Sequence, residues 1–168
     1  QSVGYPSPNF SHFRATDIWM SASDSNQVVN SGWAGRYLNE EYANYPNGYP
    51  NSTMPDPLPI QIGSVTSLVL QGPASTMGMS ITNPTSFYNL VGGIQDPAPP
   101  TPAGKELTYI RLVAQQTQQY ATVIKNAASL VPQQVTYPAN NSLADQLKIV
   151  ARLVKGGLKT RIYMVSIG

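Results

Sequence analysis

The sequence predicts an α/β fold with a mostly parallel sheet, and three observations near its end lead to this prediction. Apolar residues recur at helical spacing over 104–130 and again over 142–156, which indicates two long amphipathic helices. Gly156 and Gly157 then supply a helix stop. The apolar, β-rich run RIYMVSIG (161–168) follows, and such a run is typical of a buried parallel strand. A helix, a glycine stop and a buried strand together indicate one αβ unit of a parallel sheet.

Two shorter helices are expected near the start of the chain. Ser11 is a good N-cap, and the apolar residues between Phe13 and Met20 favour a helix over 12–22. A second helix is predicted over 31–43. The apolar side of this second helix is expected to comprise Trp33, Tyr37, Leu38 and Tyr42.

The middle of the chain alternates turn chemistry with short strand-like runs. Residues 44–58 are rich in Pro, Asn and Gly, which predicts a long surface loop. Asn83-Pro84 favours a short helix over 84–91, and a proline-rich connector follows over 95–103. The strand-like runs are 59–63, 67–71 and 76–81.

The two C-terminal helices carry further local predictions. Ser142 and Asp145 have the spacing of a capping box, so Ser142 is expected to cap its helix. The stripe expected to be buried in the first helix comprises Leu107, Ile110, Val113 or Ala114, Thr117, Tyr120 or Ala121, Ile124 and Ala128. The stripe expected to be buried in the second helix comprises Leu143, Leu147, Val150 and Val154.

Composition excludes several classes of protein. The absence of cysteine excludes disulfides and thiolate metal sites. No stretch approaches the roughly 20 apolar residues of a membrane span. Residues 101–168 carry eight basic and two acidic side chains, but without interleaved aromatics they indicate solvated helix faces rather than a nucleic-acid surface. Only 11% of residues are charged, and a surface rich in uncharged polar residues is more familiar in exported proteins.

The residues best suited to chemistry lie at the start of the first helix. A helix N-terminus attracts anions, and a serine placed there can act as a nucleophile if a metal or a base takes its proton. Ser11 is thus a candidate nucleophile, Arg14 could hold the oxygens of a phosphate or sulfate, and His12 lies beside both. The alternative is structural: Ser11 only caps the helix, and Arg14 pairs with Asp17.

Four segments of the chain form a pattern that goes beyond single motifs: VGYPSPNFSHFRATDIWMSAS (3–23), GWAGRYL (32–38), PLPIQIG (57–63) and YIRLVAQQTQQYATVIKNAA (109–128). Together they resemble a large bacterial family, the domain of unknown function 1501, whose members are exported through the twin-arginine route. The family is similar to the alkaline phosphatase and sulfatase superfamily. The resemblance implies a three-layer α/β/α sandwich and divalent metal ions such as zinc, calcium or magnesium.

The same resemblance implies roles for particular residues and a place in a larger protein. Ser11 matches the helix-start nucleophile, with Arg14 as anion holder and His12 as a metal ligand. In the family the strand matching 161–168 continues into a Gly-Phe-Asp-Thr-His segment, whose Asp and His look like metal ligands. Residues 1–168 are therefore expected to be an internal part of one larger α/β domain, inactive without the remaining portions of the polypeptide.

Two functions follow as expectations. The first is an exported hydrolase-like protein, periplasmic or on the cell surface, that acts on small phosphate or sulfate esters. The second is a non-catalytic cell-surface or assembly component that keeps the fold. The loop 44–58 and the connector 95–103 would suit partner contacts in the second case.

Overall fold

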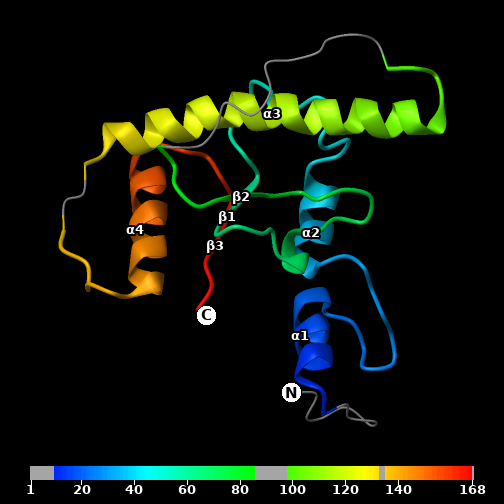
Figure 1. The fold of residues 1–168 in the computed structure, drawn as a ribbon, viewed down its shortest axis with the longest axis horizontal. Helices are drawn as coiled ribbons and strands as arrows, with labels where there is room; N and C mark the ends of the chain where they lie inside the picture. Colours follow the sequence, from blue (N-terminus) through cyan, green and yellow to red (C-terminus); the bar gives the residue numbers. More distant parts are fainter. Residues whose placement is uncertain (1–9, 86–97, 133–134, 168) are drawn as a thin grey trace.

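The computed structural model describes residues 10–85, 98–132 and 135–167. The α-helices in these ranges are α1 (His12–Ser21), α2 (Trp33–Glu41), α3 (Pro102–Leu130) and α4 (Ser142–Lys155). A short 3₁₀ helix, η1, spans Leu68–Leu70. The strands are β1 (Pro59–Ile62), β2 (Met79–Ile81) and β3 (Ile162–Met164). Figure 1 shows the path of the chain through them.

The strands form a parallel sheet in the order β2-β1-β3, which confirms the α/β class. Ile60 is level with Met79 on one side and with Tyr163 on the other. The parallel strand predicted over 161–168 is therefore present as β3. Within the described sheet it is an edge strand, and its residues are half-buried rather than buried.

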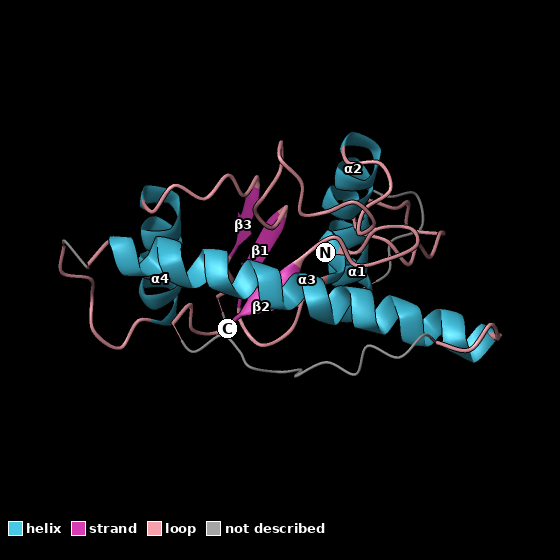
Figure 2. Ribbon diagram, turned by 90° about the horizontal axis from the view of Figure 1, so that it is seen from above, coloured by secondary structure: helices cyan, strands magenta, loops and turns pink. Residues whose placement is uncertain are grey.

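Helices lie on both faces of this sheet. Side chains alternate between the faces of a strand, so Ile60 and Tyr163 face one core, shared with α3 and α4, whereas Ile162 and Met164 face another. That second core lies under η1 and receives Met20 from α1. Figures 1 and 2 show α4 on one side of the strands and the α1–α2 pair on the other, with α3 running across both.

The helices α3 and α4 meet in close contact. A Cβ atom added at Gly156 would lie 2.2 Å from the carbonyl oxygen of Ala127, so only glycine fits at this crossing. Arg152 donates hydrogen bonds to the carbonyls of Ala128 (2.5 Å) and Val131 (3.1 Å). These carbonyls belong to the end of α3, where a helix leaves acceptors without internal partners. The end of α3 is thus capped by a side chain of α4.

The stripe predicted to be buried on α4 is wrong in part. Leu147 is 43% exposed and Val154 is 55% exposed, whereas Leu153 is fully buried and Ala144 nearly so. The physical reason is the close approach to α3. Gly156 lets the end of α4 approach the backbone of α3 at Ala127, and in this orientation Leu153 faces the core while Leu147 and Val154 face solvent.

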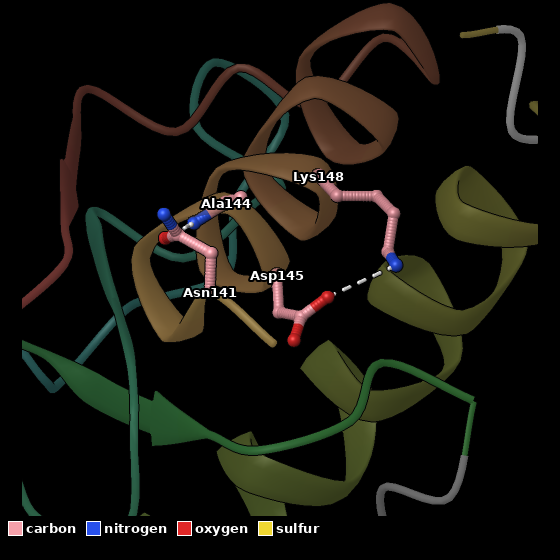
Figure 3. Close-up of polar contacts among 4 residues, drawn as sticks. All are labelled: Asn141, Ala144, Asp145 and Lys148. Atoms are coloured by element: carbon pink, nitrogen blue, oxygen red, sulfur yellow. Dashed lines mark hydrogen bonds and ion pairs between the residues drawn. The ribbon is translucent and has the colours of Figure 1, made fainter. Parts of the chain in front are cut away.

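The cap predicted for α4 is also wrong. Figure 3 shows that Asn141, not Ser142, is the N-cap: its Oδ1 accepts a hydrogen bond of 2.9 Å from the backbone N–H of Ala144. Ser142 is instead the first residue of the helix. Asp145 accepts an ion-paired hydrogen bond of 3.2 Å from Lys148 on the exposed surface. The capping box was one residue out of register because Asn141 fills the cap position.

Three other local predictions need correction. The predicted strand 67–71 contains the helix η1 (Leu68–Leu70) instead, and the Ser67 hydroxyl caps it by accepting a hydrogen bond from the backbone N–H of Val69. The loop 44–58 is not wholly at the surface: Met54, Asp56 and Leu58 are buried. The helix predicted over 84–91 lies outside the described residues except for its first two positions, which are not helical, and 95–97 of the connector also lie outside.

The exposed faces of two helices also differ from the prediction. Trp33 and Tyr37 on α2 are exposed, and Ala34 and Leu38 form its buried side instead. The first half of α3 is exposed at Ile110, while its second half carries the expected buried stripe. The buried residues of that second half are Gln116, Tyr120, Ala121, Ile124, Ala127 and Ala128.

Within the described ranges, no helix combines the length and the apolar character that a membrane crossing requires.

Candidate functional site

The predicted site lies at the start of α1, where Ser11 is the N-cap. The Ser11 hydroxyl accepts a hydrogen bond of 3.4 Å from the backbone N–H of Arg14. Ser11 and His12 are both exposed. The Ser11 hydroxyl therefore lies at the positive end of the helix dipole and within reach of solvent.

The orientation of α1 follows from contacts at its other end. Ile18 is buried, and Met20 packs into the core that holds Leu70 and Met164. The Ser67 hydroxyl, in the segment after β1, lies 3.7 Å from the Met20 sulfur. Figure 1 shows α1 starting on the side of the molecule where the chain leaves β3, so its N-terminus lies on the side of the strands' carboxyl ends. In open parallel sheets, ligands bind on this side.

Arg14 is engaged by the loop that follows α1. Its guanidinium donates to the carbonyls of Asp24 (3.0 Å) and Ser25 (3.2 Å) and also to that of Gln27. These contacts close the loop against the first half of the helix. The Arg14–Asp17 pair that the structural alternative predicted is therefore replaced by contacts to backbone carbonyls. All three contacts are made by one terminal nitrogen, Nη2, of the five-donor guanidinium. An anion-binding role for Arg14 stays a prediction.

A second arginine fixes the carboxyl end of α1. Arg36, on α2, donates to the carbonyls of Ser21 (2.6 Å) and Ser31 (2.8 Å). The Ser21 side chain is buried, and its hydroxyl donates to the Asp17 carbonyl (2.6 Å) and lies 3.0 Å from the Ser23 hydroxyl. The sequence indicated none of these hydrogen bonds. The one signal it offered is that Arg14 and Arg36 are the only basic residues among the few charges of the first 100 positions, apart from the single histidine.

His12 is the one residue assigned to a metal from the resemblance. It is an exposed residue of the first helical turn, and its carbonyl accepts a hydrogen bond of 2.9 Å from the Thr16 hydroxyl. In the part of the chain that the structure describes, no group of three or more His, Asp or Glu side chains lies close enough to hold a metal ion. His12 therefore has too few potential ligands among its described neighbours to complete a divalent-metal site.

The structure reveals a buried polar group that the sequence did not indicate, near the opposite, amino end of the strands. Tyr120 is only 2% exposed, and burial raises the pKa of its hydroxyl, with Tyr45 and Asp56 raising it further. Burial also raises the pKa of Tyr163. The Asp56 carboxylate accepts a hydrogen bond of 2.6 Å from the backbone N–H of Lys159, just before β3. From the sequence alone, Tyr120 belongs to the apolar stripe of a helix, and Tyr45 and Asp56 belong to a predicted surface loop.

Comparison with protein-family models, curated proteins and solved structures finds no match for this chain.

Proposed function

We propose that this chain is part of an exported, metal-dependent hydrolase-like protein of the alkaline phosphatase and sulfatase type, acting on phosphate or sulfate esters. The observation that carries the proposal is the position of Ser11. Its hydroxyl is exposed at the N-terminus of α1, on the side of the sheet where the parallel strands end. The resemblance of 3–23 to the domain of unknown function 1501 family supports the same residue.

In this proposal the Ser11 oxygen attacks the phosphorus or sulfur of the ester as its proton is lost, and the alkoxide leaves from the opposite side and takes up a proton to become the alcohol. Water then hydrolyses the serine ester, which releases phosphate or sulfate and restores the Ser11 hydroxyl. The first-turn N–H groups and the helix dipole favour the negative charge that gathers on the transferred group. Arg14 would hold the anionic oxygens of the transferred group. Its contacts to Asp24 and Ser25 also hold the loop beside the helix start. A divalent metal with His12 among its ligands would supply activation of the Ser11 hydroxyl.

The test compares two N-cap variants in the whole polypeptide. Ser11→Ala removes the proposed nucleophile, whereas Asn141→Ala removes a cap of the same kind on α4, on the far side of the sheet. Each is expected to lose about 1 kcal/mol of unfolding free energy. Only Ser11→Ala is expected to lose turnover of an aryl phosphate or aryl sulfate, by about a thousandfold or more, as for other nucleophile deletions. Equal turnover in the two variants would reject Ser11 as nucleophile.

A second function, a non-catalytic cell-surface or assembly component, is supported by a separate observation. Several large aromatic side chains on α1 and α2 are exposed, and aromatic residues are enriched in protein–protein interfaces. These are Phe13, Trp19, Trp33 and Tyr37. Purified whole protein that turns over neither ester class with zinc, calcium or magnesium added would favour this second function.

A further inference from the structure

A small pocket lies between α3 and the segment 45–59, near the amino ends of the strands. Its volume is about 30 Å³, and Pro59 and Met79, at the starts of β1 and β2, form part of its wall. Tyr120 and Gln116 line it from α3, and Tyr45 lines it from the facing segment. The pocket is thus near the end of the sheet opposite to the Ser11 site.

The hydroxyl of Tyr120 is the unusual group in this pocket. Tyr120 is 2% exposed, and its hydroxyl has no hydrogen-bond partner among the residues that the structure describes. The groups that influence its ionisation are Tyr45, Tyr49 and Asp56, all in the facing segment. Tyr120 and this segment line the same pocket. A buried hydroxyl without a partner destabilises a folded protein, so nearly all of them are satisfied by protein or by ordered water.

The opposite wall is held in place by Gln116. Its side-chain amide donates hydrogen bonds to the carbonyl of Tyr49 (2.7 Å) and to that of Pro46. The rings of Tyr45 and Tyr49 pack against each other with centroids 5.5 Å apart. The segment that forms this wall is therefore held to α3 by hydrogen bonds and stabilised by its own ring contact. A pocket with fixed walls does not close over the Tyr120 hydroxyl.

The size of the pocket decides what it can hold. A cavity holds a water molecule once the volume open to a water-sized probe reaches about 10–15 Å³, and buried waters occupy sites that have polar partners. Beside the Tyr120 hydroxyl, the pocket is lined by Pro46, whose carbonyl is a hydrogen-bond acceptor, and by the Gln116 amide. We infer that this pocket binds one ordered water molecule, held by the Tyr120 hydroxyl, which links α3 to the segment 45–59.

The inference is tested by crystal structures of the protein and two variants, at a resolution that shows ordered water. Tyr120→Phe removes the hydroxyl and keeps the ring. Tyr163→Phe is the matched control, because it removes a second buried hydroxyl influenced by Asp56 at a residue that does not belong to the pocket lining. A water oxygen is expected about 2.6–3.0 Å from the Tyr120 oxygen in the native protein and in Tyr163→Phe. It is expected to be absent from Tyr120→Phe.

A pocket that is dry, or filled by a side chain, in the native crystal overturns the inference. Thermal unfolding gives an independent test, because the two possibilities change the melting temperature in opposite directions. If the hydroxyl is bound to water, Tyr120→Phe loses that bond and its melting temperature falls by about 2–4 °C. If the hydroxyl has no partner, its removal relieves an unfavourable burial, and a melting temperature that rises overturns the inference as well.

Discussion

The helices α1 and α4 lie on opposite sides of the sheet and are anchored to it in different ways. Both have a side-chain N-cap, Ser11 in α1 and Asn141 in α4. The helix α4 packs along its length: Leu153 is fully buried, its neighbours fill the core with α3, and its end meets α3 at Gly156. The helix α1 buries Ile18 and Ser21, both in its second half.

The first half of α1 is held by polar contacts instead of packing. Phe13, in this half, is 86% exposed. The contact that closes this region is the set of hydrogen bonds from Arg14 to the loop carbonyls. Buried apolar surface supplies most of the folding free energy. We therefore expect α4 and its contact with α3 to contribute more to the folding free energy than the start of α1 does. The exposed start of α1 can then serve chemistry or bind a partner.

The contrast between the two helices predicts its largest loss of unfolding free energy at Leu153. It is fully buried between α4, α3 and the sheet, so Leu153→Ala should lower the unfolding free energy by about 2–5 kcal/mol. Leu147→Ala is the matched control on the same helix, because Leu147 is 43% exposed and should cost less than about 1 kcal/mol. Urea denaturation of both variants measures the difference. Equal losses would show that the buried face of α4 is misassigned.

An intermediate effect is expected at the α3–α4 crossing. Gly156→Ala places a methyl group 2.2 Å from the Ala127 carbonyl oxygen, so one helix must shift. Such overpacking should cost about 1–3 kcal/mol. Gly157 is the control for this steric clash. A Cβ at Gly157 would meet nothing within 4 Å, but its φ of +91° is strained for any residue other than glycine. Gly157→Ala should therefore destabilise without moving α4, which chemical shifts of the Ala127 region can separate.

The smallest effect concerns the cap of α4. Asn141→Ala should lower the unfolding free energy by about 1 kcal/mol, since the Asn141 side chain satisfies the N–H of Ala144. Ser142→Ala should change it by about 0.5 kcal/mol or less, because Ser142 is the first helical residue and alanine suits a helix. Thermal melts of the two variants measure this. The opposite ranking would restore Ser142 as the cap.

The sequence predicted the helices and the class of the sheet well, because their signals are local. Helical spacing placed α3 and α4 within two residues of their observed ends, and the glycine stop followed by an apolar run located β3. The rotation of α4 could not be predicted in this way. It depends on Gly156 meeting Ala127, a contact between two helices, and a stripe of large apolar residues says nothing about where small residues let backbones approach.

The candidate site was predictable to a smaller extent. The position of Ser11 as a helix cap followed from the sequence and is confirmed. The partners of Arg14 could not be foreseen, because they are carbonyls whose direction depends on the fold of the loop at 24–27. The buried hydroxyl of Tyr120 was assigned to an apolar stripe for a related reason: tyrosine has an apolar ring, and only the fold shows what its hydroxyl meets.

Native-state hydrogen exchange tests the contrast between α1 and α4 most directly. The backbone amides of 149–153 in α4, together with 124–128 in α3 and 60–62 in β1, are expected to exchange only when the whole domain unfolds. The amides of α1 are expected to exchange through local opening, at a free energy at least about 1 kcal/mol lower, because so little apolar surface holds that helix. Amides of α1 that are as protected as those of α4 would contradict this account.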